Sequence, residues 1–168
     1  MRNCVLITGP VGGGKTSVLR RMIRDGKGEN RSVGGIVAAP LYRNGKKSGY
    51  DVMNVRTGEM VPLVRSLDKY KISLIPGSRR IGRFLMLEAG LAYAMSAVEA
   101  AADADILCVD EIGPLEAGGG GHRSVLDRVL KEYNGTLWIV VRDETLQWLR
   151  EKCEGNRWTV SCVEPQKR

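Results

Sequence analysis

The sequence is poor in aromatic residues and has a single histidine. Of its 168 residues 5% are aromatic, and His122 has no partner pattern for nucleophilic or metal chemistry, so it is not expected to be catalytic. No apolar run approaches the roughly 20 residues that a membrane span needs. The apolar stretch near the N-terminus is too short, and too soon glycine-rich, for a signal peptide. We therefore expect a cytoplasmic protein with no membrane partner.

Cysteine pairs in metal-binding or redox spacing are also absent. The four cysteines stand at positions 4, 108, 153 and 162, and none of them forms a C-x-x-C pair. Two lie in apolar, strand-like runs, which favours buried reduced thiols. Neither a disulfide nor a zinc site is indicated.

A phosphate-binding motif stands near the N-terminus. Gly9, Gly14, Lys15 and Thr16 satisfy the P-loop pattern G-x-x-x-x-G-K-[ST], between an apolar run and a helical pattern as the motif requires. Glycines adopt backbone angles barred to other residues, so the N–H groups of residues 11 to 16 can turn inward around phosphate oxygens. A plain glycine-rich turn is the alternative, but chance produces the whole pattern in only about one such sequence in a hundred.

Each residue type in this loop suits a nucleoside triphosphate, the predicted substrate. Lys15 is expected to reach the β- and γ-phosphates and to act in catalysis, while the Thr16 hydroxyl is expected to ligate Mg²⁺, the predicted cofactor. The helix that begins near Lys15 adds the positive end of its dipole. The predicted nucleotide-binding residues are Gly9, Pro10, Val11, Gly12, Gly13, Gly14, Lys15, Thr16 and Ser17.

An acidic pair follows a second buried-strand pattern, at residues 106–109. This apolar run leads into Asp110 and Glu111, as when a strand delivers a carboxylate to the carboxyl edge of a parallel sheet. Asp110 is expected to hold Mg²⁺ opposite Thr16. Glu111 is expected to orient or deprotonate the attacking water, which makes it the second predicted catalytic residue. Alone this pattern is weak and often only starts a loop, but the P-loop strengthens it.

The order of elements predicts an α/β fold in a single domain, 1–168. We expect a mainly parallel twisted sheet with helices on both faces, plus an antiparallel β-meander inserted at about 33–64. A mere edge extension of the sheet is the alternative for that insertion. Strands are predicted at 3–8, 34–42, 48–55, 60–64, 83–87, 106–109, 136–141 and 157–163. Helices are predicted at 16–25, 88–102, 123–133 and 143–152.

Two segments are predicted to be loops beside the site. Residues 65–81 form a basic, irregular stretch that could lie over the phosphates, and the Gly118–Gly121 run predicts a mobile loop. An arginine is expected to neutralise transition-state charge, and the candidates in these neighbourhoods are Arg79, Arg80, Arg83 and Arg123.

Positive charge is concentrated in the first half of the chain. Residues 1–84 carry 17 Lys and Arg against 5 Asp and Glu, whereas residues 85–168 carry 9 against 14, and the whole chain has a net charge of +7. A nucleic-acid surface is not favoured, because aromatic residues do not alternate with the basic ones and a triphosphate site also prefers positive surroundings. The sequence gives no oligomeric state.

Several motifs together resemble the P-loop nucleoside-triphosphatase family that is also called cancer-related nucleoside-triphosphatase. They are the Gly9–Ser17 loop, Gly35-Ile36, Ser48-Gly49-Tyr50-Asp51-Val52, Ile81-Gly82-Arg83-Phe84 and Asp110-Glu111-Ile112-Gly113 with Glu116. The resemblance covers about residues 3 to 163. It implies a Mg²⁺-dependent hydrolase of nucleoside triphosphates with broad base tolerance. Ala38-Ala39 and the Gly118–Gly121 run depart from the family pattern.

Two other functions compete with hydrolysis of triphosphates to diphosphate and phosphate. A small-molecule or nucleotide kinase would exclude water and need an acceptor pocket, and Glu111 argues against it. A nucleotide-regulated module that binds nucleic acid or protein would turn over slowly, and the basic first half permits it.

Overall fold

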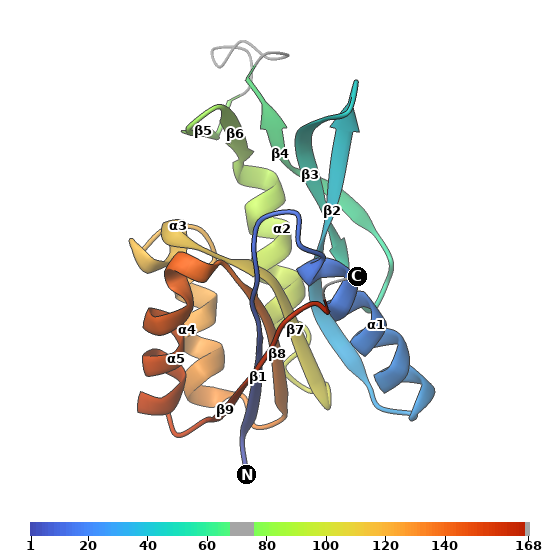
Figure 1. The fold of residues 1–168 in the computed structure, drawn as a ribbon, viewed down its shortest axis with the longest axis vertical. Helices are drawn as coiled ribbons and strands as arrows, with labels where there is room; N and C mark the ends of the chain where they lie inside the picture. The colour runs from blue at the N-terminus through green and yellow to red at the C-terminus, as the bar shows by residue number, and fades with distance from the viewer. Residues whose placement is uncertain (68–75, 167–168) are drawn as a thin grey trace.

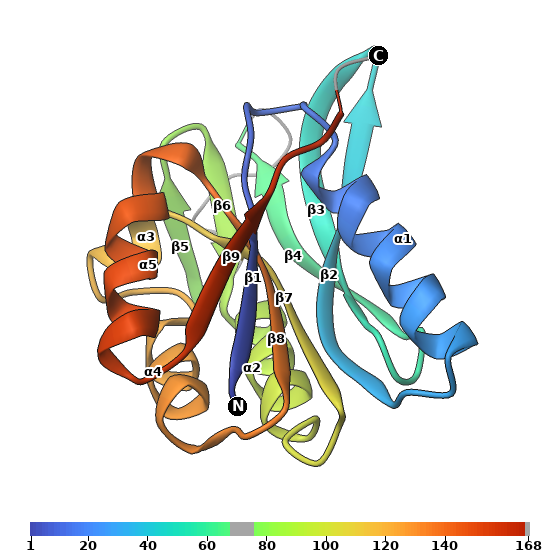
Figure 2. The same ribbon diagram turned by 60° about the horizontal axis from the view of Figure 1, so that its bottom comes forward.

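The computed structural model describes residues 1–67 and 76–166. Within them one mixed sheet runs through the molecule in the order β5-β6-β4-β3-β2-β7-β8-β1-β9 (Figures 1 and 2). Its strands are β1 (Asn3–Ile7), β2 (Val33–Arg43), β3 (Lys46–Asn54), β4 (Met60–Ser66), β5 (Ser78–Ile81), β6 (Phe84–Leu87), β7 (Ile106–Ile112), β8 (Thr136–Val141) and β9 (Thr159–Val163). The α-helices are α1 (Lys15–Gly28), α2 (Glu88–Glu99), α3 (Pro114–Ala117), α4 (Arg123–Glu132) and α5 (Leu146–Gly155), and a 3₁₀ turn, η2 (Asp143–Thr145), precedes α5.

One half of the sheet is parallel. β2, β7, β8, β1 and β9 pair with one another in that order, all in the same direction. β7 and β8 are almost entirely buried, because helices cover both faces of this half. The carboxyl ends of these strands therefore meet at a single edge of the sheet, which is where ligands of open α/β sheets bind.

The other half is antiparallel and continues the same sheet. β3, β4, β6 and β5 extend it beyond β2, each strand running opposite to its neighbour. The α/β fold and the three meander strands are confirmed. The meander joins the sheet as an extension of its edge, which was the alternative for this insertion.

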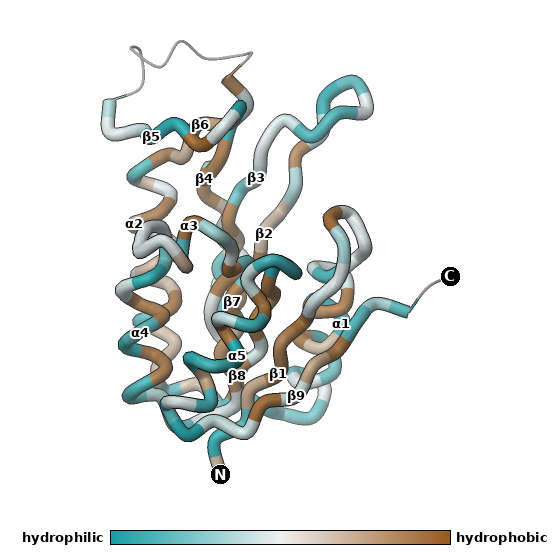
Figure 3. Tube along the Cα trace, turned by 60° about the vertical axis from the view of Figure 1, so that its left-hand side comes forward, coloured by the Kyte–Doolittle hydropathy of each residue, from teal (hydrophilic) through white to brown (hydrophobic). Residues whose placement is uncertain are grey.

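Two hydrophobic cores lie on opposite faces of the sheet. On one face α1 packs Val18, Leu19 and Ile23 against the central strands. On the other face α2, α4 and α5 cover a larger core that includes Leu107 and Ile139. Figure 3 shows this arrangement as hydrophobic central strands between the helices, with a hydrophilic tip on the β2–β3 hairpin.

Several predicted boundaries are wrong. α1 does not stop at Asp25 but continues to Gly28. Gly26 lies inside the helix and close to the sheet, since a Cβ there would stand 3.0 Å from Ile106 Cδ1. The predicted irregular loop at 65–81 is partly strand, since β4 reaches Ser66 and β5 begins at Ser78. Residues 67, 76 and 77 are in turns, and positions 68–75 lie outside the described residues.

No helix in the described ranges combines the length and the apolar character that a membrane crossing requires.

Candidate active site

The P-loop connects β1 to α1 at the carboxyl edge of the parallel half (Figure 2). Gly14 caps the helix with a φ of +93°, a left-handed conformation that a side chain would strain. Gly13 donates its N–H to the carbonyl oxygen of Pro10 at 2.9 Å, and a Cβ on it would stand 2.8 Å from that oxygen. The tight loop therefore depends on glycine at both positions.

The predicted catalytic lysine folds back over the loop. Lys15 is buried, with 7% of its surface exposed, and its Nζ donates to the carbonyl oxygen of Gly9 at 2.8 Å. A second carbonyl oxygen, that of Pro10, lies 3.4 Å from the same nitrogen. The ammonium group is thus held at the mouth of the P-loop, while Val11 and Ser17, also predicted to bind nucleotide, are exposed.

Thr16 and Asp110 meet although they lie far apart in the sequence. The Thr16 hydroxyl donates to Asp110 Oδ2 at 2.9 Å, and the Ala38 N–H of β2 donates to the same oxygen at 3.1 Å. The helix start, β7 and β2 are therefore joined at one carboxylate, which is only 3% exposed. Burial raises the pKa of Asp110 to about 6, although both hydrogen bonds favour its ionised form.

Glu111 lies in a strongly charged, half-buried environment. Burial raises the pKa of its carboxyl, while the positive charges of Lys15, Arg142 and Lys47 act in the opposite direction. Burial also disfavours the charged form of Lys47 and so lowers its pKa, and the charge of Glu111 opposes that change. Glu111 thus interacts with cations from the P-loop, from the end of β8 and from β3.

Sequence reasoning missed Asp143, which supports the start of the P-loop. Its Oδ1 accepts hydrogen bonds from the Thr8 hydroxyl at 2.6 Å and from the Gly9 N–H at 2.9 Å. These bonds hold the pKa of Asp143 below its usual value. Arg142 and Asp143 directly follow the apolar run of β8, the same pattern that pointed to Asp110, so this signal was present in the sequence.

The four candidate arginines do not gather at the acidic pair. Arg123 is held by Asp127 at 2.9 Å and by the carbonyl oxygen of Glu116 at 3.1 Å. Arg80 Nε donates to the carbonyl oxygen of Gly82 at 3.0 Å. The guanidinium of Arg83 lies over Phe84, and Arg79 lines a separate cavity. The arginine that interacts with Glu111 is Arg142, which was not among the candidates.

The glycine-rich run forms a hydrogen-bonded turn beside α3. Gly118 and Gly120 donate their N–H groups to carbonyl oxygens of α3, at 2.9 Å in both cases. Beneath the turn Glu116 accepts hydrogen bonds from the Gly113 N–H at 2.9 Å and from the His122 N–H at 3.2 Å. His122 is buried with its Nδ1 3.3 Å from Glu116 Oε1, a structural position.

Known proteins resemble this chain over most of its length. A family model described as NTPase matches residues 4–168. Nucleoside-triphosphatase THEP1 of Pyrococcus abyssi is 32% identical, over 81% of this chain and 73% of that protein. Nucleoside-triphosphatase THEP1 of Methanothermobacter thermautotrophicus is 30% identical, over 98% of this chain and 88% of that protein.

Two solved structures share the fold. The solution structure of a human cancer-related nucleoside triphosphatase superposes with a TM-score of 0.72 at 21% identity, covering 99% of this chain and 90% of that one. The crystal structure of THEP1 from Aquifex aeolicus gives a TM-score of 0.71 at 14% identity, with the same coverage of both chains. With the family model spanning nearly its whole length, the chain belongs to the NTPase family.

Proposed function

We propose that this protein hydrolyses nucleoside 5′-triphosphates to the diphosphate and phosphate, in a Mg²⁺-dependent reaction with broad base tolerance. The observation that carries the proposal is the hydrogen bond between Thr16 and Asp110 at the mouth of the P-loop. It brings a hydroxyl and a carboxylate together beside a helix N-terminus, the combination that P-loop enzymes use around a metal–triphosphate.

The donor set fits Mg²⁺ bound together with phosphate. Thr16 and Asp110 would hold the ion, and both offer the oxygen ligands that Mg²⁺ prefers. The described residues contain no cluster of three or more His, Cys, Asp or Glu side chains that could cage a metal by themselves. This agrees with an ion that arrives with its nucleotide, because Mg²⁺ usually keeps waters and phosphate oxygens as ligands. When bound, it would neutralise charge that develops on the phosphate oxygens.

The chain's own residues supply the remaining chemistry. The Lys15 ammonium, already at the loop mouth, would move from the Gly9 carbonyl to the β- and γ-phosphates and stabilise their negative charge. Glu111 would orient the attacking water and accept its proton, since burial raises the pKa of this carboxyl toward the range of a general base. Asp143 would keep the first residue of the P-loop in position through the Gly9 N–H.

Broad base tolerance rests on the sequence. It contains no Asn-Lys-x-Asp motif of the kind that reads guanine. Without such a motif we expect the preference for any one of the four nucleotides to stay below roughly 100-fold, which corresponds to about 2.7 kcal/mol.

The experiment is a panel of phosphate-release assays with ATP, GTP, CTP and UTP, with and without Mg²⁺. We expect release from all four nucleotides and loss of release when EDTA removes the metal. Adding RNA to the same assays tests the regulatory alternative, because a nucleic-acid-dependent module would turn over only with RNA. No release from any nucleotide would contradict the proposal.

A further inference from the structure

Residues of the β5–β6 hairpin, the first turn of α2 and the α3 turn line a cavity of about 270 Å³. Three apolar side chains line it, Met86, Leu91 and Leu115, together with Arg79 and Glu88. None of its lining residues belongs to the P-loop or the acidic pair. Its volume is just below the range of drug-sized sites, so a molecule with one ring fits it better than a larger ligand.

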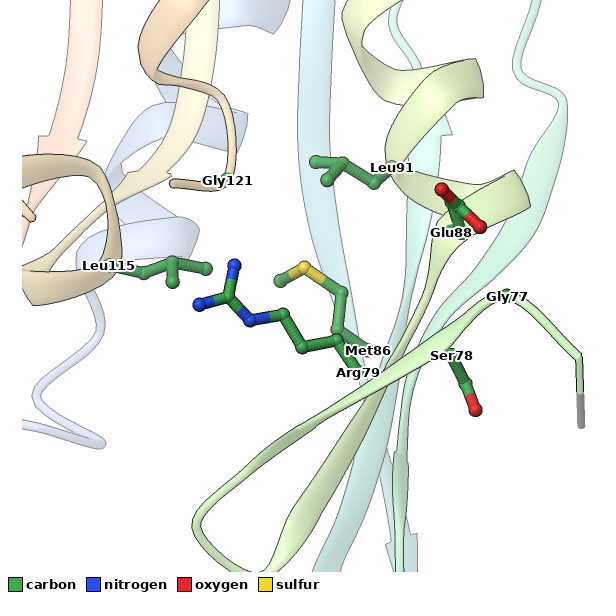
Figure 4. A pocket seen from close by; sticks show the side chains of 8 residues that line it. All are labelled: Gly77, Ser78, Arg79, Met86, Glu88, Leu91, Leu115 and Gly121. Carbon is green, nitrogen blue, oxygen red and sulfur yellow. The ribbon is translucent and has the colours of Figure 1, made fainter. Parts of the chain in front are cut away.

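The cavity contains a cation, Arg79, that has no ion-pair partner among the described residues. Figure 4 shows the Arg79 guanidinium extending from β5 toward Leu115, beside the side chain of Met86. In the described part of the chain Arg79 takes part in no ion pair, whereas Arg65 is paired with Asp51 at 2.6 Å and Arg123 with Asp127 at 2.9 Å. A guanidinium over an apolar floor binds a carboxylate or phosphate well, because its planar fork makes two parallel hydrogen bonds.

A second cavity, between α2 and α4, provides a contrast. Its volume is about 310 Å³, and it too contains an arginine, Arg128. Arg128, however, is paired with Glu99 at 2.7 Å. Its cation is already neutralised, so an anion would gain little there. Of these two cavities, the β5–β6 cavity is therefore better suited to an anionic ligand.

Glu88 and Arg79 give the cavity one acidic and one basic side chain. Its carboxylate stands at the start of α2, on the far side of Met86 from the Arg79 guanidinium (Figure 4). A ligand would place its anionic group at Arg79, its apolar body on Met86 and Leu115, and a hydrogen-bond donor toward Glu88. We propose that this cavity is a second binding site, separate from the nucleotide site, for a small organic acid with one apolar ring.

The test is a titration of the full chain with benzoate, followed by NMR of the methionine and leucine methyl groups. Met86 and Leu115 report on the cavity directly. We expect saturable shifts of both signals, with a Kd on the order of 1 mM for so small a molecule. Benzamide, which has the same ring without the charge, should bind about tenfold more weakly.

Arg79→Met and Arg80→Met form a matched pair on one strand. Arg79→Met should raise the Kd for benzoate about tenfold, because the cation is lost while the apolar length is kept. Arg80→Met removes the same charge from the neighbouring position and should leave the Kd unchanged. Glu88→Gln should remove the preference that we expect for 4-aminobenzoate over benzoate.

Three results would overturn the proposal: no saturable shift at Met86, equal affinity for benzoate and benzamide, or equal effects of Arg79→Met and Arg80→Met. Shifts confined to residues around the P-loop would overturn it as well, since the acid would then occupy the nucleotide site. Phosphate release from ATP in the same samples reports on the nucleotide site independently. A negative binding result in the cavity would therefore not count against the proposed hydrolase activity.

Discussion

The two halves of the sheet differ in how they present side chains to a ligand. In the parallel half every strand ends at the same edge, so the P-loop after β1, the acids of β7 and the Arg142–Asp143 pair after β8 converge there. In the antiparallel half successive strands end at opposite edges, so its chemistry comes from side chains on the faces, such as Lys47 and Arg79. We infer that the parallel half carries the reaction and that the antiparallel half modulates it.

Lys15→Ala should have the largest effect. We expect turnover to fall by about 1000-fold or more and triphosphate binding to weaken, because no other residue replaces the point charge on the phosphates. Steady-state phosphate release and nucleotide titration measure the two effects. Lys27→Ala is the matched control on the same helix, since its Nζ donates to the carbonyl oxygen of Val55 away from the loop. Equal activity of the two variants would refute the site assignment.

Glu111→Gln should lower turnover by roughly 100-fold with nearly normal Mg²⁺–triphosphate affinity. The substitution keeps the shape of the side chain but removes its basicity. Asp110→Asn is the comparison, because weakening a metal ligand should also raise the Mg²⁺ concentration required. Trapped, unhydrolysed triphosphate on the Gln variant would support the water-activating role. Hydrolysis at the wild-type rate would mean that Glu111 is only structural.

Arg142→Ala should reduce turnover about tenfold, since Arg142 is the arginine whose charge acts on Glu111. Alanine at Arg79, Arg80, Arg83 or Arg123 should leave turnover within about threefold of wild type, because none of them gathers at the acidic pair. Single-turnover assays of the five variants measure this ranking. A larger loss at one of the four would mean that the antiparallel half or the α3 turn takes part in the reaction.

Much of the parallel half could be predicted from the sequence, because its signals are local. A buried parallel strand is a continuous apolar run, and the polar residue that follows it marks the functional edge, as for Asp110. The same rule also points to Asp143, but a single acid after a strand is too common to mark a site without the hydrogen bonds that Thr8 and Gly9 donate to it.

The remainder depends on contacts between distant segments. The predicted helix 16–25 stops before Gly26, because glycine often follows a helix end, but Gly26 is buried against Ile106 and Trp138, which no local pattern reveals. β5 is not predicted, because Arg79 and Arg80 are typical of a solvated loop, but in the structure it pairs with β6 as an edge strand. No local pattern marks Lys47 either, since only the folded sheet brings its charge to act on Glu111.

Lys47→Met tests whether the antiparallel half influences the reaction at all. The Lys47 ammonium favours the ionised form of Glu111 and so holds the pKa of that carboxyl down. Because a general base must be ionised, activity rises as pH rises through this pKa, and removing the cation should move the acid limb of kcat/KM to higher pH. We expect the loss of turnover to be greatest on the acid side of this pKa and to vanish at higher pH. Lys46→Met, on the exposed neighbouring position of β3, is the control. A pH-independent loss, or equal profiles for the two variants, would show that Lys47 does not act through Glu111.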